Sequence, residues 1–120
     1  MNPWTAAGAL TYAGIGIASL LRPASVPVLF GGRADNAGAR TEIRAVYGGL
    51  PLGVAAALVV QPGTSAVMAG LSGAMAAGRA GSLLLEDDAP SRANLAFLGV
   101  ESVLALALLL GHRLEHRSTR

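Results

Sequence analysis

Residues 45–78 read AVYGGLPLGVAAALVVQPGTSAVMAGLSGAMAAG and carry no charged side chain. A soluble domain does not leave so long a run uncharged, whereas a helix that crosses a bilayer needs roughly 20 apolar residues. Gln61-Pro62-Gly63 divides the run, because proline cannot donate to the helical hydrogen-bond ladder and disfavours helical angles in the residue before it. The stretch therefore predicts two membrane-spanning helices, over about 41–60 and 64–85, joined by a tight hairpin.

The rest of the chain has a similar character. Hydrophobic residues make up 52% of the 120 residues and charged residues only 13%, which favours a membrane protein over a soluble domain. Two further apolar segments, about 3–21 and 91–111, are long enough to span a bilayer. We therefore expect an all-α fold with a single transmembrane domain over residues 1–120, an integral membrane four-helix bundle of up-down-up-down topology.

The segments outside these helices are short. Residues 22–40 contain several prolines and glycines around the apolar patch Val26 to Phe30, and we expect them to form an interfacial linker. A re-entrant excursion is the alternative, since irregular backbone inside lipid must be shielded by protein. Residues 112–120 are expected to form a cationic tail in water. Basic residues near the helix ends lean slightly toward the face of the first and third loops, which predicts a multi-pass protein of the cell membrane with both termini non-cytoplasmic.

Small residues recur at four-residue spacing on the third predicted helix, in the row Ala66, Gly70, Ala74, Gly78 and Ser82. Lipid provides no hydrophobic drive for helices to associate, so close packing depends on small residues that let backbones approach. The third helix is therefore expected at the centre of the bundle. The alternative is that alanine and glycine are simply common in this composition. The residues expected at helix contacts are Gly49, Gly53, Gly70, Gly73, Ala74 and Gly78.

Two charged residues stand out within the predicted membrane segments, Arg79 on the third and Glu101 on the fourth. An ionised side chain near the bilayer centre costs about 2.5–3.5 kcal/mol on insertion scales, so such residues are normally paired or functional. A short loop joins these two helices and makes them antiparallel neighbours. Arg79 and Glu101 then differ in depth by only roughly 6 Å, within the reach of an arginine side chain, which predicts a salt bridge.

The second helix enters the membrane from the same face and brings Glu42, Arg44 and Tyr47 to comparable depths. Arg44 lies in a first helical turn, where a cation opposes the helix dipole, so it is expected to have an anionic partner. The resulting polar intramembrane cluster of Glu42, Arg44, Tyr47, Arg79 and Glu101 has three interpretations. It pins three helices together, it forms a site for a lipid headgroup or a partner protein, or it translocates protons or ions.

The sequence offers little for catalysis. His112-Arg-Leu-Glu115-His116 matches the H-x-x-E-H pattern of some zinc peptidases, but it lies at the end of the chain without a further ligand, so a solvated cationic helix end is the better interpretation. No nucleophile elbow or phosphate loop is present. We expect no enzyme activity, no catalytic residue, no metal site and no cofactor.

One stretch resembles a known family. The run Glu42-Ile-Arg44-Ala-Val-Tyr47-Gly48-Gly49, followed by Pro51-Leu-Gly53, is similar to small four-helix membrane proteins grouped as domain of unknown function 4345. Members look similar in having a glycine-arginine step on the third helix, here Gly78-Arg79, and a buried glutamate on the fourth, here Glu101. The resemblance implies the same membrane topology and a polar cluster, and it implies no activity.

The functional expectation follows from the small extramembrane mass and the many close-packing surfaces. We expect a non-enzymatic accessory or stabilising subunit of a larger envelope membrane complex, such as a lipid or solute transporter. The alternative is a stand-alone lipid-binding or small-molecule transport module that uses Arg44, Arg79 and Glu101. Membrane lipids and another integral membrane protein are the expected partners, and no nucleic acid is expected.

Overall fold

The regular elements of the protein are all helices in the computed structural model, which describes residues 1–118 and 120. In chain order they are α1 (Pro3–Leu21), α2 (Ser25–Leu29), α3 (Ala37–Ile43), the π-helix η1 (Arg44–Gly49), α4 (Leu50–Val60), the 3-10 helix η2 (Pro62–Thr64), α5 (Ser65–Leu85) and α6 (Arg92–Ser118). The elements α3, η1 and α4 follow one another without a break and form one helix, Ala37–Val60.

Local chemistry accounts for where these helices begin. The Asn2 side chain accepts hydrogen bonds from the backbone N–H groups of Trp4 and Thr5 and so caps α1. Asn36 caps α3 in the same way through the Ala39 N–H, at 2.8 Å. The long helix therefore begins at Ala37, inside the expected linker, which also contains the short helix α2.

Pro51 explains the π-helix in the middle of the second long helix. Proline has no N–H to donate and its ring clashes with the carbonyl four residues earlier, so an α-helix cannot run through it undisturbed. The six residues of η1 end just before α4, which carries Pro51 in its first turn. The disturbance at this proline thus takes the form of a local widening of the helix.

Three described helices are long and apolar enough to cross a membrane: α1, Ala37–Val60 and α6. The fourth predicted span, α5, is a helix of 21 residues but is not among them. Its many glycines and serines and the charge of Arg79 lower its hydropathy. The helix α6 continues through Ser118, so most of the expected tail 112–120 extends α6 by about two turns.

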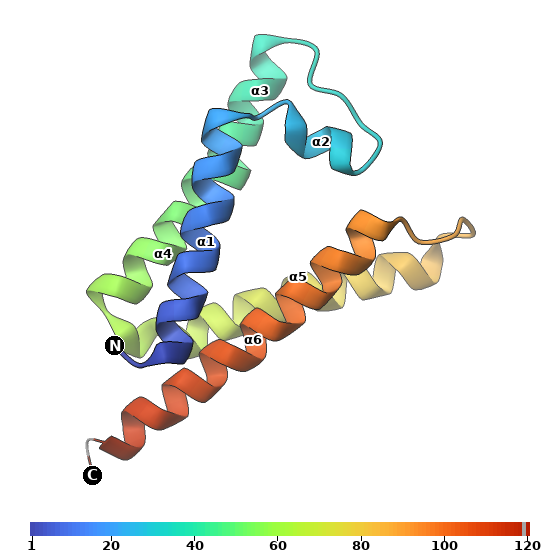
Figure 1. Cartoon of the computed structure of the whole chain (residues 1–120). Coiled ribbons are helices and arrows are strands. Elements are labelled where there is room, and N and C mark those ends of the chain that lie inside the picture. The colour runs from blue at the N-terminus through green and yellow to red at the C-terminus, as the bar shows by residue number, and fades with distance from the viewer. Residues whose placement is uncertain (119) are drawn as a thin grey trace.

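The long helices form two antiparallel hairpins that meet at one end and splay apart (Figure 1). One hairpin pairs α1 with η1 and α4, the other pairs α5 with α6, and α1 also contacts α6 where the hairpins meet. The molecule measures 52 × 32 × 16 Å. Because one helix with its side chains is about 10–12 Å across, the molecule is thin, and the closed up-down-up-down four-helix bundle is not confirmed.

The core lies where the two hairpins meet. It consists of Ala9 and Tyr12 from α1, Val54, Ala55 and Leu58 from α4, Ala69 from α5, and Leu104 and Leu108 from α6. Many large apolar side chains outside this core are exposed, including Leu10, Val60 and Leu84. Such a surface suits contact with lipid tails, in keeping with the three candidate membrane spans.

Close approach of backbones occurs at glycines other than the predicted ones. A Cβ on Gly16 would lie 2.8 Å from the Gly48 carbonyl oxygen, and a Cβ on Gly48 would lie 2.6 Å from Leu20. In contrast, nothing lies within 4 Å of a Cβ built on Gly53, Gly70 or Gly78. Within the described chain, no close approach of this kind occurs at these three predicted positions.

The other three predicted contact residues also make few contacts with neighbouring helices. A Cβ on Gly49 would meet only its own helical segment, at Arg44, and one on Gly73 would just reach Ala105 at 3.9 Å. Ala74 is exposed. The small-residue row therefore faces outward, and α5 lies at the edge of the molecule, because the face that packs on α6 and the core carries Ala69, Ser72 and Arg79 instead.

Candidate functional site

The predicted salt bridge between Arg79 and Glu101 is present and bidentate. Arg79 Nε donates to Glu101 Oε2 at 3.0 Å and Arg79 Nη2 donates to Glu101 Oε1 at 2.7 Å. The Glu101 side chain is only 4% exposed and that of Arg79 is 23% exposed. The fork of the guanidinium matches the two carboxylate oxygens, which is the geometry that best offsets the cost of removing both charges from water.

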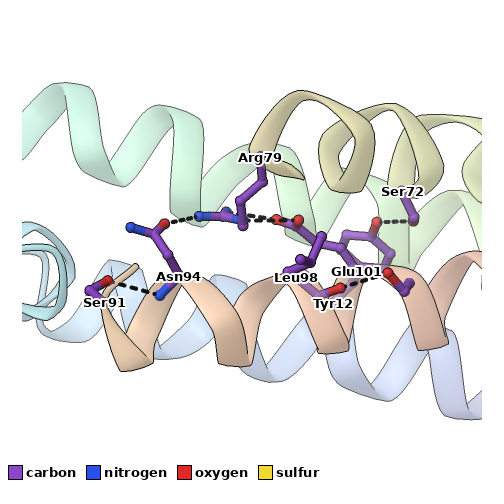
Figure 2. A network of polar contacts seen from close by, with 8 residues as sticks. Tyr12, Ser72, Arg79, Ser91, Asn94, Leu98 and Glu101 are labelled. Atoms are coloured by element: carbon purple, nitrogen blue, oxygen red, sulfur yellow. Dashed lines mark hydrogen bonds and ion pairs between the residues drawn. The ribbon is translucent and has the colours of Figure 1, made fainter. Parts of the chain in front are cut away.

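A third polar side chain completes this network. Arg79 Nη1 donates to Asn94 Oδ1 at 2.6 Å, and the backbone N–H of Asn94 donates to Ser91 Oγ at 3.1 Å (Figure 2). Ser91 precedes α6 and caps its first turn. The cap bonds the backbone of Asn94, whose side chain bonds Arg79. Asn94 and Glu101 lie on the same face of α6, two turns apart, and hold Arg79 from both sides.

Two neighbouring aromatic rings lie beside the guanidinium. The Arg79 Cζ lies 5.7 Å from the centre of the Phe30 ring and 5.5 Å from that of Phe97, and the two ring centres are 5.4 Å apart. Phe97 belongs to α6, while Phe30 follows α2 in the linker. Both contacts fall within the range of cation–π interactions, so the linker is attached to the second hairpin at the charged pair.

A second polar contact joins the two hairpins near the core. The Tyr12 hydroxyl of α1 bonds the Ser72 hydroxyl of α5 (Figure 2). Ser72 Oγ also donates to the carbonyl of Met68 at 2.9 Å. A serine hydroxyl has one hydrogen to give, so Tyr12 must be the donor in their shared bond. This contact fixes the rotation of α1 against α5.

The structure does not bring all five cluster residues together. Arg44 Nε donates to the carbonyl of Leu20 at 3.1 Å, so its partner is the negative end of α1 and not the expected anion. Tyr47 is exposed, and among the described residues no hydrogen bond joins it to Arg79. Glu42 is exposed and has no ion pair within the described chain.

The hairpins are clamped at the end where they meet. Asn2 Nδ2 donates to the carbonyl of Gly111 at 2.9 Å and to Glu115 Oε1 at 2.8 Å, while its oxygen caps α1. His112 and His116 follow on the same part of α6, with ring centres 4.2 Å apart. The residues of the H-x-x-E-H match thus belong to a helix contact, where Glu115 accepts from Asn2.

Sequence reasoning missed Asn94, Phe30, Phe97, Tyr12 and Ser72. Asn94 and Phe97 lie on the Glu101 face of α6, seven and four residues before it, so helical spacing was a usable signal for them. Phe30 carried no such signal, because its position depends on how a linker folds back. Tyr12 and Ser72 required knowledge of which faces of α1 and α5 meet.

The chemistry of this site is that of a satisfied charge pair. The guanidinium uses three of its nitrogen atoms in hydrogen bonds to Glu101 and Asn94, and two rings lie within cation–π distance of it. The positive and negative charges cancel. Its evident effect is to fix the register of α5 against α6 and to hold the linker in place.

These features define an all-helical protein with three helices able to cross a membrane and a paired charge between its last two helices. The chain belongs to the family described as a domain of unknown function (DUF4345), whose model matches residues 2–112. The family resemblance seen in the sequence is thereby confirmed. No curated protein and no solved structure matches the chain.

Proposed function

We propose that the protein is a non-enzymatic, multi-pass protein of the cell membrane that serves as an accessory subunit of a larger membrane complex. The uncovered face of α5 is the observation that carries this proposal. Gly70, Ala74 and Gly78 are exposed, and nothing lies within 4 Å of a Cβ built on either glycine. The face is therefore open to a helix of another protein.

Lipid is a poor cover for such a face. Small residues offer little side-chain area to an acyl chain, whereas a second helix can approach their backbone closely and gain van der Waals contact along its length. Among the described helices, α5 is also not one of the three that are long and apolar enough to span a membrane. A partner helix would supply the apolar contact that α5 lacks.

The stand-alone lipid-binding module has less support from the contacts. It requires free cations, but Arg79 is neutralised by Glu101 and bonded to Asn94. Arg44 is separated from this pair and bonds a carbonyl of α1. A headgroup would have to displace Glu101 or Asn94 to reach Arg79, and Arg44 alone does not form the three-residue site that this alternative requires.

Site-specific photocrosslinking in native membranes tests the proposal. A photoreactive residue at Gly70 should yield an adduct with another membrane protein, because this position faces the proposed partner. The matched position is Gly99 on α6, which is also exposed and also has nothing within 4 Å of a built Cβ. It should give only lipid adducts.

A substitution experiment gives the second readout. Gly70→Leu should leave folding unchanged, because the side chain enters open space, yet it should remove the protein that co-purifies in mild detergent. Gly99→Leu should retain that protein. A chain that purifies alone, or that loses its partner equally in both variants, would refute the accessory role at this face.

A further inference from the structure

Three buried polar atoms have no hydrogen-bond partner among the described residues: Thr5 Oγ1 on α1, Ser65 Oγ at the start of α5, and His112 Nδ1 on α6. Thr5 and Ser65 are both 0% exposed. Buried polar atoms without a partner are rare in folded proteins, since burial removes their hydrogen bonds to water. Three of them on three different helices point to a shared partner.

Contacts place Thr5 beside the His112 end of α6. A Cβ on Gly111 would collide with the Thr5 hydroxyl, so this hydroxyl faces the α6 backbone next to His112. The Asn2 side chain bonds the Gly111 carbonyl and holds the two helices together at this level.

The helix register brings Ser65 to the same level. Gly73 of α5 faces Ala105 of α6, and Ser65 lies eight residues before Gly73 while His112 lies seven residues after Ala105. Because α5 and α6 are antiparallel, these steps of about two turns lead to the same height.

A second pair of helices supports this placement. The Tyr12 hydroxyl of α1 bonds Ser72 of α5, and Thr5 and Ser65 each lie seven residues earlier, on the same helix faces. Both helices start at the end where the hairpins meet and diverge from there (Figure 1). The long tyrosine spans the wider gap, and the short hydroxyls lie where the gap is narrower.

We propose that Thr5, Ser65 and His112 share one bound water molecule, which links α1, α5 and α6 at the junction of the two hairpins. A buried water typically makes about three hydrogen bonds to polar groups that lack other partners. Two hydroxyls and one imidazole nitrogen can supply both donors and acceptors to it. His112 is partly exposed and gives the site its connection to solvent.

A double-mutant cycle on the full chain in detergent tests this proposal. Thr5→Val and Ser65→Ala should each lower the unfolding midpoint, because the water loses a ligand and the remaining groups lose theirs. The double variant should fall no further than the worse single variant, since both changes remove the same water. His112→Phe, which keeps a ring beside His116, should be coupled to both hydroxyls in the same way.

Ser19→Ala is the matched control, because Ser19 is buried but its hydroxyl already donates to the Ile15 carbonyl at 2.8 Å. Its effect should add to that of Thr5→Val. Single variants as stable as the wild type, or additive effects of Thr5→Val and Ser65→Ala, would overturn the proposal. Coupling between Thr5 and Ser65 that excludes His112 would indicate a direct hydroxyl pair and would also overturn it.

A wild-type structure that resolves ordered water gives a direct readout without any variant. A water within hydrogen-bond distance of Thr5 Oγ1, Ser65 Oγ and His112 Nδ1 is the expected result. Direct contacts among the three side chains, or bonds from them to their own helix carbonyls, would contradict the proposal.

Discussion

The two hairpins of this protein are held together by different means. In the first, α1 and η1 approach closely because Gly16 and Gly48 bring backbone against backbone, and the one described side-chain hydrogen bond between them runs from Arg44 to the Leu20 carbonyl. In the second, α5 and α6 are joined by the buried Arg79–Glu101 pair, while the glycines of α5 mostly face outward. Small residues therefore mark a helix contact in one hairpin and an open face in the other.

This difference follows from what each contact needs. Close backbone approach needs the absence of a side chain on both helices, so it is sensitive to any added atom. A charge pair needs two long side chains that reach across a wider gap, and it tolerates small residues nearby without using them. The first hairpin should be broken by added volume and the second by an unpaired charge.

The largest expected effect is in the second hairpin. Arg79→Leu or Glu101→Leu leaves a buried charge without its partner, and we expect each to destabilise the fold by about 3–5 kcal/mol. The double replacement removes both charges and should recover much of this loss. Unfolding of the four proteins in a mixed-detergent titration measures the coupling between the two positions.

Asn94→Leu supplies a graded comparison within the same network. It removes one hydrogen bond to the guanidinium but keeps the salt bridge, so its effect should be smaller than either charge deletion. Single charge variants with wild-type stability would show that the pair does not hold α5 to α6.

A smaller effect is expected in the first hairpin. Gly16→Ala places a methyl group 2.8 Å from the Gly48 carbonyl oxygen, and backbone must shift to admit it, so we expect a loss of about 1–3 kcal/mol. Gly53→Ala on α4 is the matched change, because its methyl enters open space. It should be neutral or stabilising by up to about 1 kcal/mol through helix propensity.

The same unfolding titration compares these two alanine variants. Equal losses at Gly16 and Gly53 would mean that both positions are packed and that the two hairpins do not differ in the proposed way. A loss at Gly16 alone would show that the glycines on the predicted list and the glycines at real contacts are distinct sets.

Much of the second hairpin could be predicted from the sequence. A short loop between two apolar segments makes them antiparallel neighbours, so the depths of Arg79 and Glu101 are enough to predict their salt bridge. The orientation of the small-residue row on α5 could not be predicted in the same way. Four-residue spacing shows that Gly70, Ala74 and Gly78 share a face, but it does not show whether that face is turned inward.

Contacts that depend on how the linker folds could not be predicted from the sequence. Arg44 was expected to bond an anion, yet its hydrogen-bond partner is the Leu20 carbonyl at the end of α1, which the turn of residues 22–36 brings to it. The angle between the two hairpins could not be predicted either, because segment lengths set how far helices reach and not the angle between them.

The smallest expected effect concerns the link between the linker and the second hairpin, at Phe30. Phe30→Leu keeps an apolar side chain but removes the ring beside Arg79, so it should cost about 0.5–2 kcal/mol and mainly free the linker. The N–H of Gly32 donates to the Pro27 carbonyl at 2.8 Å, and its hydrogen exchange should become several-fold faster because this turn opens more often. Leu29→Ala changes the exposed neighbour and should leave the exchange rate unaltered. If both variants exchange alike, the linker is held by general apolar contact, and the charged pair serves the second hairpin alone.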